Sequence, residues 1–197
     1  MKSNQTYTLA KEILNNISSL SEKSFNELES LFDFNSVNKD EIFIQIGKKN
    51  NSEYIIVNGF CRSFLINPEG EETTLSFYKP KSVLSPHIIR TKNQVSLLNY
   101  QALTDLELIK FDSDKFLSLM IENMEIRNLG NTILLNELIS KTGREIALAS
   151  LSAKERLIKF RNEFIILENL IAHPIIASYL GITNVSLSRL RSEMVKG

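Results

Sequence analysis

The chain has 197 residues, and its 23 Lys and Arg residues balance its 23 Asp and Glu residues. This length allows two small domains, and the neutral overall charge argues against a protein that coats nucleic acid through charge alone. The single cysteine, Cys61, excludes a disulfide framework, and no N-terminal apolar run resembles a signal peptide or a membrane span. We therefore expect a cytoplasmic protein.

The N-terminal part of the chain changes from a helical to a β pattern. Residues 6–17 carry apolar side chains at helical spacing, and a second helix is expected after Ser21, its N-cap. From Glu41 onward, short β-rich runs are separated by turn signals such as Asn58-Gly59 and Pro68-Glu69-Gly70. This series of short strands predicts a sandwich, a roll or a barrel within an α+β fold.

Residues 112–150 return to a helical pattern, with a short amphipathic helix around residues 116–120 and then a longer helix without proline. The apolar positions of the longer helix are Ile126, Leu129, Ile133, Leu134, Leu138 and Ile146. This apolar stripe is wider than packing against a single neighbouring part of the chain would require. Packing against the same helix of a second subunit explains the breadth, and burial against the β domain explains it equally well.

A second unit begins at Leu151, because Ser152 and Glu155 have the spacing of a capping box. The sequence thus predicts a hinge near residues 148–152, a domain of residues 1–150 and a domain of residues 151–197. The second domain holds seven Lys and Arg against four Asp and Glu, so the basic excess lies there.

Residues 164–171 connect this new helix to the end of the chain. They are apolar and β-branched, and they are expected to form a short strand or an extended connector.

The stretch from Ala172 to Met194 predicts two short helices that meet at a tight angle. Pro174 fits the first turn of the first helix, and Gly181 suits the corner, where one residue must approach positive φ. Apolar and small residues at matching positions form the expected helix-turn-helix core, namely Ile176, Ala177, Leu180, Gly181, Ile182, Leu187 and Leu190.

The second of these helices begins after its cap, Thr183, and turns a small, polar and basic face outward. Such a face suits the DNA major groove, where Arg189 can bond the O6 and N7 atoms of guanine. The residues expected at the DNA are Thr183, Asn184, Val185, Ser186, Ser188, Arg189 and Ser192. An ordinary helical hairpin with a solvated arginine face is the alternative, and the agreement in register favours the helix-turn-helix.

A β domain, a long helix, a hinge and a C-terminal helix-turn-helix resemble, in this order, the Crp/Fnr family of bacterial transcription regulators. The strongest motif is IASYLGITNVSLSRLR, residues 176–191, whose LGIT and SLSR segments look like the branch common in Bacteroidetes. Residues 54–78 are similar to the first strands of the family's cyclic-nucleotide-binding β-roll. The resemblance implies an antiparallel, jelly-roll-like β-roll with flanking helices, a dimerisation helix and a homodimer that reads a palindromic site.

The family's base-reading positions fall on Asn184, Val185 and Arg189. Arg189 matches the family pattern, whereas Val185 stands where many members have a glutamate that accepts a bond from cytosine. The resemblance therefore implies DNA binding but names no operator.

The stretch similar to the family's phosphate cassette, Ser82 to Ser96, departs further from the pattern. It has no Gly, no Glu for the ribose hydroxyl and no Arg at the position that meets the phosphate. A buried phosphate without these partners would be unpaired at a penalty of several kcal/mol, so we expect no cAMP binding in the family's usual way. Arg90 and Lys92 are expected in a solvated loop.

Other chemistries find less support. An iron-sulfur site needs four thiolates, and a haem ligand would have to be His87 or Cys61, which are residues more often structural in such places. A cupin-type metal site needs converging histidines, but His87 and His173 fall in different predicted domains. A cupin-like enzyme or binding protein and an interaction module with a vestigial helix-turn-helix remain the alternatives.

The expected molecule is therefore a regulator without enzyme activity, cofactor or metal. Its expected partners are double-stranded DNA and a second copy of the chain. RNA polymerase and an unidentified small-molecule effector are further candidates, and no membrane is expected.

Overall fold

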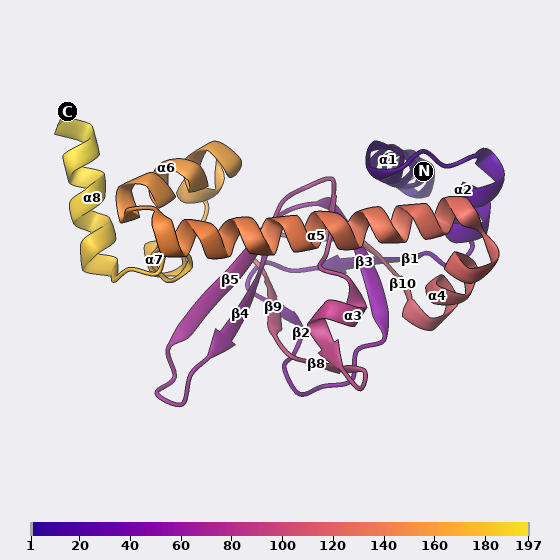
Figure 1. Cartoon of the computed structure of the whole chain (residues 1–197), viewed down its shortest axis with the longest axis horizontal. Coiled ribbons are helices and arrows are strands. Elements are labelled where there is room, and N and C mark those ends of the chain that lie inside the picture. Colours follow the sequence, from indigo (N-terminus) through magenta and orange to yellow (C-terminus); the bar gives the residue numbers. More distant parts are fainter. Residues whose placement is uncertain (1, 197) are drawn as a thin grey trace.

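The computed structural model describes residues 2–196 as a β-roll with N-terminal helices, one long helix and a C-terminal helical unit (Figure 1). The helices are α1 (Lys2–Ile17), α2 (Glu22–Glu29), α3 (His87–Arg90), α4 (Ser113–Glu122), α5 (Met124–Ser150), α6 (Ala153–Glu163), the 3-10 turn η1 (Leu167–Asn169), α7 (His173–Leu180) and α8 (Asn184–Lys196). The strands are β1 (Asp33–Val37), β2 (Ile42–Ile44), β3 (Ser52–Asn58), β4 (Cys61–Ile66), β5 (Glu72–Tyr78), β6 (Ser82–Val83), β7 (Thr91–Lys92), β8 (Val95–Ser96), β9 (Asn99–Ala102) and β10 (Leu106–Asp112). The predicted α+β class and antiparallel β domain are confirmed.

Two four-stranded antiparallel sheets make the roll, in the orders β1-β10-β3-β6 and β2-β9-β4-β5, with a small β7-β8 ribbon beside them. Strand β3 is buried on both faces. Tyr54 and Ile56 point into the roll, whereas Ile55 and Val57 join an apolar cluster with the surrounding helices. Alternate residues of a strand face opposite sides, which explains why this segment is a continuous apolar run.

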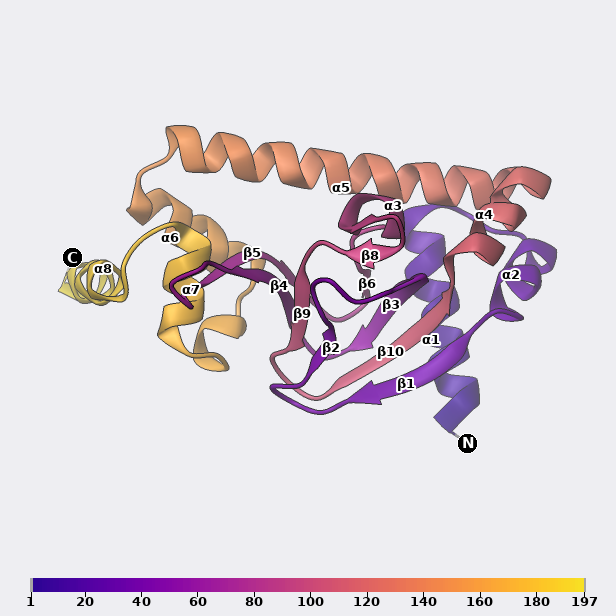
Figure 2. The same cartoon turned by 90° about the horizontal axis from the view of Figure 1, so that it is seen from below.

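Helices α1, α2, α4 and α5 pack against the outer face of the first sheet, as the view from below shows (Figure 2). A separate apolar cluster joins α6, α7 and α8 to the other end of the roll through Phe60, Phe77 and Leu103. The C-terminal helices therefore share a core with the roll and pack directly on its surface.

Helix α5 is apolar on two opposite faces. Ile126 and Leu129 are fully buried against the roll and the N-terminal helices. About half a turn round the helix, the outer face exposes Leu135 by 56%, Leu138 by 62%, Ile139 by 61% and Ile146 by 58%. Contact with the rest of the chain thus accounts for the inner face only.

No helix within residues 2–196 is long and apolar enough to cross a membrane.

The chain breaks between α5 and α6 where the capping box was predicted. Leu151 is extended at φ −96° and ψ 143°, which ends α5. The Ser152 hydroxyl then accepts a bond from the backbone N–H of Glu155, and the Glu155 carboxylate accepts one from the backbone N–H of Ser152. These reciprocal bonds satisfy the open end of the new helix.

The expected short strand or extended connector at residues 164–171 is wrong in both forms. The segment contains the 3-10 turn η1, and the backbone N–H of Leu167 donates to the carbonyl oxygen of Phe164 at 3.0 Å. Phe164 and Leu167 are both buried, at a spacing of three residues. The segment thus packs as a turn against α6 and α7, and burial at this spacing overrides the β propensity of its isoleucines.

Candidate nucleic-acid interface

Residues 172–194 form two helices joined by a tight turn. Pro174 lies in the first turn of α7, and Gly181 ends α7 in the left-handed conformation at φ 67°. The backbone N–H of Ile182 donates to the carbonyl oxygen of Ala177 at 3.0 Å, which closes the turn. Of the predicted core residues, the structure buries Ile176, Ala177, Leu180 and Leu187, half-buries Ile182 and Leu190, and leaves Gly181 exposed at the corner.

The outer face of α8 carries the predicted DNA-contacting residues. Thr183, Asn184, Val185, Ser188, Arg189 and Ser192 are exposed, and Ser186 is half-buried. The Thr183 hydroxyl accepts a bond from the backbone N–H of Ser186 at 3.1 Å, as expected of the cap. Leu187 and Met194 point the other way, into the C-terminal apolar cluster.

The two arginines of α8 have different surroundings. The Nε atom of Arg191 lies 3.2 Å from Glu168 Oε1, and Glu168 also accepts bonds of 2.6 and 2.9 Å from Arg161. The bonds from Arg161 are the main reason why the pKa of Glu168 is lowered, so this carboxylate stays charged. Arg189 is exposed and forms no ion pair or hydrogen bond with the side chains of residues 6–194. It is therefore available to a ligand, whereas Arg191 is held within the fold.

Arg90 lies inside the roll, so its expected place in a solvated loop is wrong. It ends α3 and is only 1% exposed. Its guanidinium donates to the carbonyl oxygen of Ser85 at 2.9 Å, to Asn50 Oδ1 at 2.6 Å and to the carbonyl oxygen of Ser52. Three oxygen atoms that converge on one point satisfy the buried charge, and no local sequence pattern reports such a convergence.

Aromatic rings surround this guanidinium. Its central carbon lies 5.2 Å from the ring centre of Tyr54 and 6.0 Å from that of Tyr100. Tyr78 packs against Tyr100 with ring centres 6.0 Å apart. Side chains of the chain itself thus occupy the roll interior around Arg90. Lys92, two residues further on, is exposed as expected but lies in strand β7 and not in a loop.

Glu53 is the acidic group beside Arg90. Both of its carboxylate oxygens lie 3.0 Å from the backbone nitrogen of His87, whose N–H donates to them. Burial raises the pKa of Glu53 to about 7, although Arg90 and the N–H of His87 act in the opposite direction.

The residues considered as metal or haem ligands are occupied by other interactions. The Nε2 atom of His87 lies 2.9 Å from the carbonyl oxygen of Asn50, and burial is the main cause that lowers the pKa of His87. Cys61 is fully buried, which raises the pKa of its thiol. His173 lies at the start of α7, in contact with Arg191. The structure does not bring these three side chains together into one site.

Comparison with known proteins agrees with this architecture. Residues 34–123 match the family model of the cyclic nucleotide-binding domain. FixK2 from Bradyrhizobium japonicum is similar in structure, with a TM-score of 0.70 and 20% identity over 84% of this chain and 85% of FixK2. A protein from Eubacterium rectale described as a transcriptional regulator of the Crp/Fnr family also has a TM-score of 0.70, at 19% identity over 90% of this chain and 85% of that one.

A third similar structure is that of CLP from Xanthomonas campestris, described as a c-di-GMP responsive global regulator. Its TM-score is 0.68 at 11% identity, over 89% of this chain and 92% of CLP. No curated protein sequence matches the chain. Residues 34–123 are therefore similar to the cyclic nucleotide-binding domain, and the chain as a whole shares its fold with these three structures, one of which is described as a regulator of the Crp/Fnr family.

Proposed function

We propose that this protein is a sequence-specific DNA-binding transcription regulator that acts as a homodimer and catalyses no reaction. The observation that carries the proposal is the outer face of α8, where Arg189, without an ion pair among the side chains of residues 6–194, stands among the small side chains of Val185, Ser188 and Ser192. Small neighbours let the helix enter the major groove closely enough for the guanidinium to reach a base edge. In this proposal residues 1–150 form the sensor and dimerisation domain, and residues 151–197 form the DNA-binding domain.

Two-fold symmetry defines the expected target. A dimer formed through the exposed face of α5 presents two copies of α8, which bind successive major grooves about 34 Å apart on a palindromic site. Asn184, Val185 and Arg189 are proposed to face the bases. Thr183, Ser186, Ser188 and Ser192 adjoin bases or phosphates, and the N-terminus of α8 places the helix on the DNA backbone.

Substitution Arg189→Ala tests the DNA contact. Genomic fragments are first selected with the purified wild-type protein, and the best duplex is then titrated by fluorescence anisotropy. We expect the substitution to weaken specific binding by about 1–3 kcal/mol, because one bidentate arginine–guanine contact is lost. The matched control is Arg127→Ala, which removes an exposed arginine from α5. Equal losses in the two variants, or selection without any enriched sequence, would contradict the proposal.

The proposed regulator does not respond to cAMP. The support is the absence of the family's phosphate and ribose partners in residues 82–96, together with the side chains around Arg90 that fill the roll interior. A ligand at a hundred times its Kd stabilises a protein by about 2.7 kcal/mol, which raises Tm by about 5–10 °C at this chain length. We expect millimolar cAMP to shift Tm no more than 5′-AMP does. A rise of several degrees with cAMP alone would sink this part of the proposal.

A further inference from the structure

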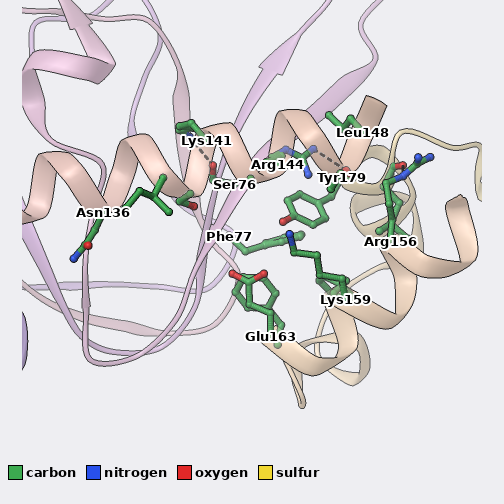
Figure 3. A pocket seen from close by; sticks show the side chains of 17 residues that line it. Ser76, Phe77, Asn136, Lys141, Arg144, Leu148, Arg156, Lys159, Glu163 and Tyr179 are labelled. Carbon is green, nitrogen blue, oxygen red and sulfur yellow. Dashed lines mark hydrogen bonds between the residues drawn. The ribbon is translucent and has the colours of Figure 1, made fainter. Parts of the chain in front are cut away.

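A cavity of about 410 Å³ lies where the roll, the long helix and the C-terminal unit meet. Strand β5 forms one wall, the C-terminal half of α5 forms another and α6 forms the third, and Tyr179 of α7 lies between Phe77 and Arg144 (Figure 3). This volume is in the range of small-molecule sites in proteins. The cavity spans the break at Leu151, because its walls come from both sides of it.

The side chains around the cavity are strongly basic. Lys141 and Arg144 project from α5, and Arg156 and Lys159 from α6. Among the described lining residues, Glu163 is the one carboxylate. Because these cations line one partly enclosed space, their positive fields add.

The fold orients these cations without neutralising most of them. Arg144 donates to the backbone carbonyl oxygen of Tyr179 at 2.7 Å, and Arg156 donates to those of Leu180 at 2.9 Å and Leu151 at 2.6 Å. Carbonyl oxygens fix a guanidinium in place but leave its net charge intact. Of the four cations, only Lys141 lies within 4.0 Å of a carboxylate in the described part of the chain, that of Glu137 at 3.3 Å. Lys159 is exposed.

Aromatic rings form the apolar part of the same wall. Phe77 of β5 lies with its ring centre 4.8 Å from that of Tyr179 and 5.6 Å from that of Phe160. Arg144 lies over the Tyr179 ring, 3.9 Å from its centre. Aromatic rings and positively charged side chains therefore line the same cavity. A ligand that fits it has both a flat apolar part and an anionic group.

We propose that this cavity binds a small organic anion with a flat apolar body. The anionic group contacts Lys159 and the guanidinium groups of Arg144 and Arg156, and the apolar body lies against Phe77 and Tyr179. This site is distinct from the roll interior around Arg90. Binding itself does not depend on the proposed regulatory function, since the cavity and the outer face of α8 share no residue.

The site spans the break between α5 and α6, so a bound ligand restricts movement at this hinge. Arg156 of α6 donates hydrogen bonds to the carbonyl oxygen of Leu151, which precedes α6, and to that of Leu180, which ends α7. An anion that contacts both α5 and α6 adds a second connection across the break at Leu151. The ligand thus favours the arrangement in which α7 packs on β5, where Ser178 donates to Thr74 Oγ1 at 3.0 Å.

The probe for this site is 8-anilinonaphthalene-1-sulfonate, a flat apolar anion whose fluorescence rises on leaving water. We expect Lys159→Glu to weaken its binding about tenfold, because a charge at the cavity wall is reversed. The matched control is Lys154→Glu, which makes the same change on the same helix outside the cavity and should alter binding less than about twofold. Far-ultraviolet circular dichroism checks that both variants are folded.

A second probe separates charge from apolar contact. N-phenyl-1-naphthylamine has the same rings without the sulfonate, and we expect it to bind the wild type about tenfold more weakly and to be insensitive to Lys159→Glu. Equal effects of the two α6 variants, or equal affinity for the two dyes, would overturn the proposal. Dye bound to the exposed face of α5 gives the first of these results. Either outcome leaves the Arg189 experiment unaffected.

Discussion

Substitution of Leu135 and Ile139 together by glutamate is expected to make the protein monomeric and to weaken binding to a palindromic site at least about a hundredfold. Both side chains are more than half exposed on the outer face of α5. In the proposed dimer they meet their copies at the two-fold axis, where charged groups would be buried against one another. A monomer binds one half-site and loses the gain in affinity that comes from linking two.

The chain offers a close control for this double substitution. Leu117 and Ile121 are also exposed, also a leucine and an isoleucine four residues apart, but they lie on α4. Their replacement by glutamate should leave the dimer and its DNA affinity unchanged. Sedimentation velocity gives the oligomeric state, and anisotropy with the selected duplex gives the affinity. A Leu135/Ile139 variant that remains dimeric would place the interface elsewhere.

The expected effect rests on the division of α5 into two faces. Exposed apolar side chains scattered singly are ordinary on protein surfaces, but Leu135, Ile139 and Ile146 recur at spacings of four and seven residues along one line of the helix. A line of this kind matches the seam between two packed helices. The breadth of the apolar stripe in the sequence left burial on the roll and dimerisation equally open. The structure assigns the inner face to the roll and leaves the outer one uncovered.

Elements that are specified by a few neighbouring residues could be predicted from the sequence. The capping box at Ser152 and the corner at Gly181 each depend on a few neighbouring residues, and both were located from the sequence. Strand β1 was missed, because most of its residues are exposed and its sequence, DFNSV, has no apolar alternation. Its place is fixed by pairing with β10, more than 60 residues away.

The two candidate sites also differ in whether the sequence could predict them. The outward face of α8 follows from helical periodicity, so Arg189 could be selected from the sequence. The cavity cations Lys141, Arg144, Arg156 and Lys159 could not, because they line one cavity only when α5 and α6 pack beside Phe77 of the roll. Their one signal was a pair of cations three residues apart on each side of the predicted hinge. That pattern alone is typical of solvated helix faces.

Replacement of Arg90 by methionine should lower the free energy of unfolding by about 3–5 kcal/mol, because each buried acceptor left unpaired costs about 1–3 kcal/mol and this change leaves three. Methionine keeps the long aliphatic stem but removes every donor, so Asn50 Oδ1 and the carbonyl oxygens of Ser52 and Ser85 lose their bonds inside the roll. Unpaired buried acceptors are destabilising because the unfolded chain bonds them to water. Urea unfolding at one fixed protein concentration measures the change without an effect from dimerisation.

Lys92→Met is the matched control, because Lys92 lies two residues away, is exposed and should change the free energy of unfolding by less than about 0.5 kcal/mol. Arg90→Lys separates charge from geometry: it retains the positive charge but lacks the planar fork that reaches three oxygens in different directions, so its stability should fall between those of the wild type and Arg90→Met. If Arg90→Met and Lys92→Met are equally stable, Arg90 is solvated as the sequence pattern indicated, and the roll interior is then open to a ligand. A large loss confined to Arg90→Met means that the protein's own guanidinium holds together the region similar to the phosphate cassette. An effector would then have to act elsewhere, and the cavity beside the hinge is placed to receive it.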